Sequence, residues 1–79
     1  MLDQKLLSEE LCQELAGIMK LPSIGPEDDL LDLGIDSLSA LRFFEILNQK
    51  LNREISIASL FEYPSVKELL EMAAADTES

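Results

Sequence analysis

The chain contains no histidine and a single cysteine, Cys12, among its 79 residues. A triad of the serine-hydrolase type needs an imidazole base, and structural zinc sites are built mainly from cysteine and histidine, so both kinds of site are excluded. One cysteine cannot form a disulfide within the chain, which fits a reducing compartment. Cys12 lies between Leu11 and Leu15 in a helical pattern, and we expect its thiol to be buried as a small hydrophobic group.

Positive charge is also scarce, since 6 lysines and arginines face 16 aspartates and glutamates and leave a net charge of −10. Such a surface repels nucleic acids and anionic lipids and favours encounters with basic patches on other proteins, although acidity can also serve only to keep a small domain dissolved. No apolar run is long enough to span a membrane, and the first residues lack a secretion signal. We therefore expect a cytoplasmic, monomeric protein with neither a nucleic-acid nor a membrane partner.

Glycine and proline number three each, and aromatic residues make up only 5% of a chain rich in leucine. This composition favours helices over strands, and glycine and proline are too few for a low-complexity or disordered chain. The apolar spacing predicts an all-α fold, a small four-helix bundle formed by one domain over 1–79. The predicted elements are a helix over 3–20 capped by Asp3, a long loop over 21–36, a helix over 37–51, a short helix over 57–62 capped by Ser56, a helix over 65–75 with Ser65 and Glu68 at capping-box spacing, and a frayed tail over 76–79.

The second predicted helix has two apolar faces. The face expected to join the core comprises Ala40, Phe44, Leu47 and Leu51, with Phe43 beside it. Leu38 and Leu41 fall on a different side. We expect Leu38 to be exposed, whereas for Leu41 exposure and packing under the long loop remain open. Further core residues are expected to be Leu60 and Phe61 of the short helix, and the loop anchors Leu30, Leu31, Leu33 and Ile35.

The first turn of the second helix carries the residue of greatest chemical interest, Ser37. Gly34 supplies backbone freedom for the turn that precedes it, and Asp36 is expected to cap the helix. The hydroxyl would thus be held outward at a fixed place, with no imidazole to make it a nucleophile. This predicts a serine that is modified, although a serine in a first helical turn is also common without any such role.

The acidic loop does not match the residue pattern of a calcium-binding loop. If a calcium-binding loop began at Asp29, its third and fifth positions would be Leu31 and Leu33, which cannot ligate the ion. We therefore predict no metal site, apart from loose divalent binding by Glu27, Asp28 and Asp29. Acid–base catalysis by paired carboxylates would need a cleft that a bundle this small rarely builds.

Two segments of the chain resemble acyl and peptidyl carrier proteins. Residues 28–38 read DDLLDLGIDSL, similar to the attachment motif of that family, and residues 60–66 read LFEYPSV, similar to a segment frequent in modular carriers. The resemblance implies that a phosphopantetheinyl transferase, using Mg²⁺, moves 4′-phosphopantetheine from coenzyme A to Ser37, with Asp36 as the supporting acid. The domain would then hold acyl groups as thioesters and do no chemistry itself.

The resemblance also implies a surface that partner enzymes read, namely a loading enzyme and downstream synthase or tailoring enzymes. Its expected contacts are Leu38, Leu41, Arg42, Glu45, Asn48, Gln49 and Ile57. Much of the acidic charge typical of this helix in fatty acid carriers is replaced here by Arg42, Asn48, Gln49 and Lys50, which favours a carrier of secondary metabolism. Within that class, a polyketide-type acyl carrier is slightly favoured over a discrete peptidyl or aminoacyl carrier, and the chain resembles either a free-standing protein or a domain excised from a larger synthase. The remaining alternatives are an unmodified interaction module and, more remotely, a small acid-based enzyme.

Overall fold

The computed structural model describes residues 4–76, which form four helices and, within that range, no strand. The helices are α1 (Gln4–Met19), α2 (Ser37–Leu51), α3 (Ser59–Glu62) and α4 (Val66–Asp76). The expected all-α fold is therefore confirmed. The cap proposed at Asp3 and the tail residues 77–79 lie outside the described residues. No helix within the described range is long and apolar enough to cross a membrane.

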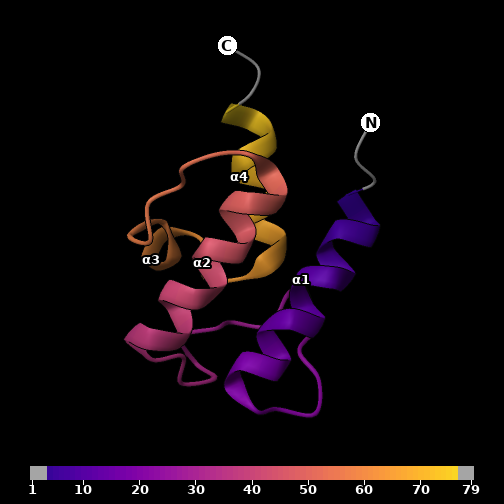
Figure 1. Cartoon of the computed structure of the whole chain (residues 1–79), viewed down its shortest axis with the longest axis vertical. Helices are drawn as coiled ribbons and strands as arrows, with labels where there is room; N and C mark the ends of the chain where they lie inside the picture. The colour runs from indigo at the N-terminus through magenta and orange to yellow at the C-terminus, as the bar shows by residue number, and fades with distance from the viewer. Residues whose placement is uncertain (1–3, 77–79) are drawn as a thin grey trace.

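Helix α1 packs against both α2 and α4, and α3 is a short turn at the side of the bundle (Figure 1). Helices α1 and α2 run in opposite directions, so the last turn of α1 and the first turn of α2 lie at the same end of the molecule (Figure 1). The first turn of α1 and the last turn of α4 lie at the other end. This arrangement places Ser37 and the long loop together at one end of the bundle.

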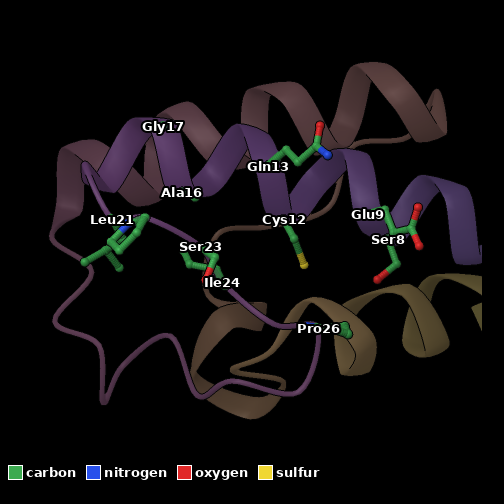
Figure 2. A pocket seen from close by; sticks show the side chains of 11 residues that line it. Ser8, Glu9, Cys12, Gln13, Ala16, Gly17, Leu21, Ser23, Ile24 and Pro26 are labelled. Carbon is green, nitrogen blue, oxygen red and sulfur yellow. The ribbon is translucent and has the colours of Figure 1, made fainter.

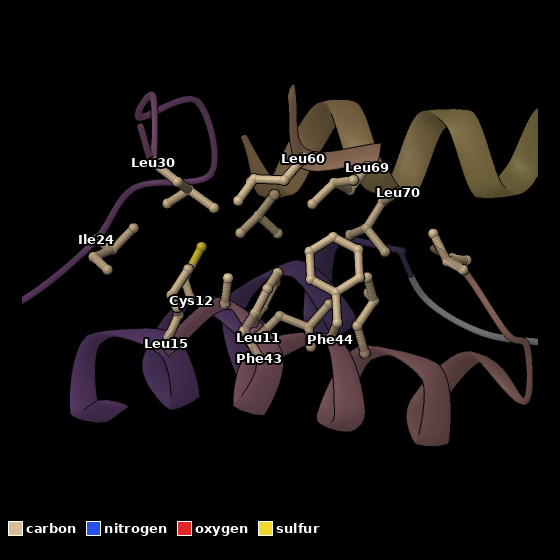
Figure 3. Close-up of a cluster of buried hydrophobic side chains, with 14 of the residues drawn as sticks. Leu11, Cys12, Leu15, Ile24, Leu30, Phe43, Phe44, Leu60, Leu69 and Leu70 are labelled. Atoms are coloured by element: carbon tan, nitrogen blue, oxygen red, sulfur yellow. The ribbon is translucent and has the colours of Figure 1, made fainter. Parts of the chain in front are cut away.

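The core is formed where α1, α2 and α4 face one another, and leucine and phenylalanine fill most of it (Figure 3). Phe43 is fully buried, and its ring meets the ring of Phe44 edge to face, with centroids 5.7 Å apart and planes at 88°. Ala40 and Leu47 are buried beside them, while Leu51 at the end of α2 is half-buried against the cluster. The predicted inward face of α2 is therefore the face that packs.

The long loop between α1 and α2 is held to the core by fewer leucines than expected. Leu30 is fully buried and Ile35 packs against the core, but Leu31 and Leu33 are about 40% exposed, so those two predicted anchors are wrong. The carboxylate of Asp29 accepts hydrogen bonds from the backbone N–H groups of Leu31 and Asp32, which coils the chain into a tight turn. That turn directs one leucine inward and the next outward.

A second anchor of this loop, Ile24, was not expected from the sequence. Ile24 is 7% exposed and belongs to the core cluster. Backbone hydrogen bonds add to this attachment, because Leu30 N–H donates to Pro64 O at 2.7 Å and Lys67 N–H donates to Pro26 O at 2.8 Å. The loop is thereby tied to the start of α4, and a connection of this length becomes part of the fold.

Helix α3 differs most from its prediction. It begins at Ser59 instead of residue 57, and the hydroxyl of Ser56 accepts from Ala58 N–H in the turn before it, instead of capping the helix. Leu60 is buried, but Phe61 is 73% exposed, so its assignment to the core is wrong. Adjacent residues on a helix point about 100° apart, and this single turn faces the bundle with Leu60 only.

Helix α4 begins as its capping pattern predicts. The hydroxyl of Ser65, just before the helix, accepts the backbone N–H of Glu68 at 3.2 Å. Ser65 is only 4% exposed, so this bond also satisfies a buried polar group. The helix extends to Asp76, one residue past the predicted end.

Candidate functional site

Ser37 is presented by a turn that the preceding residues build. Gly34 adopts a positive φ of 85°, a conformation that side chains with a Cβ rarely take, and its N–H donates to Leu31 O. Ile35 N–H then donates to Leu30 O, which closes the turn over a buried leucine. The chain leaves this turn extended at Asp36 and enters α2 at Ser37.

Asp36 is the N-cap of α2, as predicted. Its carboxylate accepts the backbone N–H of Ser39 at 2.7 Å. This bond, with a smaller contribution from the Ser39 side chain, holds the pKa of Asp36 below its usual value because both stabilise the ionised form. An ionised carboxylate therefore stands directly before Ser37, at the positive end of the helix dipole.

The Ser37 side chain is exposed at the tip of α2. The chain has no histidine, and the neighbouring carboxylate of Asp36 is engaged in capping, so nothing here activates the hydroxyl as a catalytic nucleophile. An exposed hydroxyl on a rigid helix end is instead accessible to another enzyme. The arrangement suits a residue that receives a group.

The surface beside Ser37 is apolar and unusually open. Leu38 is 63% exposed, as predicted, and Leu41 is 51% exposed, which decides against the alternative that it packs under the long loop. Arg42, Glu45 and Gln49 are exposed further along α2, and Ile57 is 37% exposed before α3. The ring of Phe61 in α3 is 73% exposed as well, and it is the exposed apolar residue that sequence reasoning missed. Its pairing with Leu60 in an apolar dipeptide gave no sign of which would face outward.

Asn48 does not belong to this surface in the way expected. It is half-buried, and its side-chain amide forms two hydrogen bonds with the backbone of Ile55. The amide nitrogen donates to Ile55 O at 3.3 Å, and the amide oxygen accepts Ile55 N–H at 3.0 Å. Its polar atoms thus fix the segment between α2 and α3, and its role as a partner contact stays a prediction. No sequence pattern distinguishes such an asparagine from a solvated one.

The other polar groups offer no second chemical centre. Among the described residues no three of histidine, cysteine, aspartate and glutamate gather in a way that could hold a metal ion. Asp28 and Asp29, which were considered for loose cation binding, accept backbone hydrogen bonds from Gly25 and Leu31 instead. Their carboxylates serve the shape of the loop.

A cavity of about 530 Å³ lies between α1 and the segment that follows it, lined among others by Ser8, Cys12 and Gln13 (Figure 2). The Cys12 thiol is buried at its wall, as expected, and that burial raises the pKa of the thiol. A thiol kept protonated in this way is a poor nucleophile. Ser37 does not line this cavity.

Comparison with known families shows which family the chain belongs to. The family described as "Phosphopantetheine attachment site" matches residues 9–73, a range that includes all of α2 and α3 and most of α1 and α4. The chain belongs to this family. Its members carry 4′-phosphopantetheine covalently and act as carriers, not as catalysts.

Related sequences occur within much larger proteins. The carrier domain is 38% identical over 63 residues to a dimodular nonribosomal peptide synthase of Bacillus subtilis (strain 168), covering 80% of this chain and 3% of that protein. It is 25% identical over 71 residues to the polyketide synthase PksL of the same organism, covering 82% of this chain and 2% of that protein. The chain thus spans only a few hundredths of the length of these relatives.

The fold has a close counterpart among solved structures. BlmI, a type-II acyl carrier protein from Streptomyces verticillus involved in bleomycin biosynthesis, superimposes with a TM-score of 0.83 at 23% identity, over 94% of this chain and 89% of that one. At this level of identity the likeness concerns the fold. It shows that this chain shares the overall fold of that carrier protein.

The residues around Ser37 fit the group that defines the family. A phosphate ester on a long arm needs a hydroxyl with open space around it, and Ser37 is exposed at the start of α2. The adjacent Gly34 lacks a side chain, and a Cβ placed on it would meet nothing within 4 Å. The end of the domain that presents Ser37 is therefore open on the side of Gly34.

Proposed function

We propose that Ser37 is the residue that carries 4′-phosphopantetheine and that this carrier domain delivers acyl or aminoacyl groups between enzymes of a secondary-metabolite synthase. The observation that carries the proposal is the exposed Ser37 hydroxyl, held by the Asp36 cap at the first turn of α2. When bound, the group supplies a thiol on a flexible arm, which holds the cargo as a thioester. The protein contributes a rigid attachment point and a surface for recognition.

Asp36 has two functions in this proposal. It fixes the first turn of α2 through Ser39 N–H, and with it the backbone position of Ser37. Its carboxylate also remains ionised and exposed, with a pKa lowered by the same bond, and is available to help position the Mg²⁺ used by a phosphopantetheinyl transferase. A hard divalent cation prefers such oxygen ligands.

The apolar surface of Leu38, Leu41, Ile57 and Phe61 is the proposed contact for partner enzymes, with Arg42, Glu45 and Gln49 at its border. Exposed apolar groups that cluster in this way mark interaction sites on small proteins. A large aromatic ring such as Phe61, 73% exposed, supplies much of the contact area that a partner can bury. The transferase, the loading enzyme and the downstream synthase would use this surface in turn.

The cargo has two candidates. The segment Gly34 to Ser37 and the match to a polyketide synthase favour an acyl group of polyketide type. The match to a nonribosomal peptide synthase, at higher identity, favours an aminoacyl or peptidyl group. Mass spectrometry of the thioester on protein purified from its native host distinguishes them.

The attachment is tested by incubating the protein with coenzyme A, Mg²⁺ and a promiscuous phosphopantetheinyl transferase, followed by intact mass measurement. We expect a gain of one phosphopantetheine that Ser37→Ala abolishes. Ser39→Ala is the matched control, because it removes a hydroxyl two residues away and should leave the gain intact. A folded protein that gains no mass, or a Ser37→Ala variant that still does, would contradict the proposal and favour an unmodified interaction module.

A further inference from the structure

A groove of about 320 Å³ opens beside Ser37, between the end of α1 and the turn that enters α2. Met19, Lys20 and Leu21 line it from the α1 side. Leu33, Asp36 and Ser39 line it from the other side, so its wall includes residues that flank Ser37 in the sequence. The antiparallel course of α1 and α2 brings these two segments to the same end of the bundle (Figure 1).

The lysine in this groove holds an uncommon backbone conformation. Lys20 has a φ of 59°, in the left-handed region where glycine or asparagine usually ends a helix. The bonds around it are those of a regular helix end: Leu21 N–H donates to Ala16 O at 2.9 Å, and Lys20 N–H donates to Gly17 O at 3.3 Å. A lysine at this position costs about 1 kcal/mol more than glycine would. The side chain of Lys20 is exposed and makes no ion pair with any residue between 4 and 76.

The groove matches the chemistry of the arm that Ser37 is proposed to carry. The phosphodiester next to the serine is an anion, and the domain has a net charge of −10, with Asp36 ionised beside the attachment point. Lys20 is the positive charge in the groove wall. Met19, Leu21 and Leu33 in the wall supply apolar surface for the dimethyl group of the pantoate unit, and Ser39 supplies a hydroxyl for its polar groups.

We infer that this groove is a resting site for the proximal half of the tethered 4′-phosphopantetheine arm, with Lys20 paired to its phosphate. The inference rests on the proposed attachment at Ser37. Tethering makes a weak site effective, because the arm is always at high local concentration. Docking there would leave the apolar surface of Leu38, Leu41, Ile57 and Phe61 clear for a partner enzyme.

Nuclear magnetic resonance of the holo-protein tests this inference. Holo-protein is prepared with coenzyme A, Mg²⁺ and the transferase, and its amide shifts are compared with those of the apo-protein. We expect shift changes at Met19–Leu21, far from Ser37 in sequence, and nuclear Overhauser contacts between the pantoate methyls and the Met19 methyl. Changes confined to residues 36–39, with no such contacts, would show a freely moving arm and overturn the inference.

The ionic part is tested by Lys20→Gln, which keeps a polar side chain one atom shorter and removes its charge. Loss of an exposed ion pair should reduce the ratio of docked to undocked arm by about two- to fivefold. Lys67→Gln is the control, since Lys67 pairs with Glu27 and does not line the groove. Each variant is referred to its own apo spectrum, because Lys20 also interacts with the negative end of α1. Unchanged docking in Lys20→Gln would overturn the assignment of Lys20 to the phosphate.

The two proposals fail in distinguishable ways. Absence of any mass gain at Ser37 removes both the attachment and the docked arm. If the mass gain is normal and Ser37→Ala abolishes it, but Met19–Leu21 show neither shift changes nor Overhauser contacts, only the groove assignment is removed. Leu33→Ala provides an independent check, because Leu33 is 40% exposed and its truncation should weaken the methyl contacts while the fold persists.

Discussion

Replacing Phe43 by alanine should severely destabilise the domain. The side chain is fully buried and its ring meets Phe44 edge to face at 5.7 Å. Truncating a buried phenylalanine costs about 3–5 kcal/mol, and the lost ring contact favours the upper part of that range. For 79 residues the total free energy of unfolding is about 4–12 kcal/mol, so the variant would lose a large share of it, and all of it at the low end of that range.

The matched control is Phe61→Ala, which removes the same ring from a site that is 73% exposed. We expect a change within about 0.5 kcal/mol. Both values come from urea unfolding followed by circular dichroism, with the slope against denaturant used to check that the same surface is exposed. If Phe43→Ala is too unstable to give a native baseline, Phe43→Leu, which keeps most of the volume, should cost about 1 kcal/mol.

Two outcomes would refute this reasoning. A near-neutral Phe43→Ala would mean that α2 presents a different face to the core. A Phe61→Ala variant as destabilised as Phe43→Ala would mean that the turn of α3 is rotated and that its ring packs inside. Either result would also remove the apolar surface on which the proposed partner contacts depend.

Three further predictions concern the ends and the outer face of α2. The pKa of Asp36 is lowered on folding, so its contribution to stability is present above the usual aspartate pKa and is lost as the pH falls through the folded value. The substitution Asp36→Asn keeps a capping oxygen but cannot ionise. It should remove this part of the pH dependence in acid titrations followed by circular dichroism. Asn48→Ala should lower the free energy of unfolding by about 1–3 kcal/mol, because it breaks both bonds to Ile55, whereas exposed Gln49→Ala should be near neutral in the same urea assay; equal effects would contradict the structural role of Asn48. Leu38→Asp should slow modification by the transferase while the helical spectrum stays unchanged, and a loss of helix would place Leu38 in the core.

Local signals in the sequence determined much of the attachment site. The apolar spacing set α2 at 37–51, which is its observed range. Asp36 caps this helix through a residue three positions on, and Gly34 supplies the positive φ of the turn before it. Interactions of this kind involve neighbours in the chain, so residue types and their spacing suffice to predict them.

Only the tertiary structure decided which members of an apolar run turn inward. Leu30 is buried whereas Leu31 and Leu33 are half-exposed, and Leu60 is buried whereas Phe61 is not. These residues are chemically equivalent in the sequence, and the choice depends on where α4 and the long loop meet, through bonds such as Leu30 N–H to Pro64 O. Hydrophobicity sets how much apolar surface is available to bury, but the geometry of segments distant in the chain selects which side chains bury it.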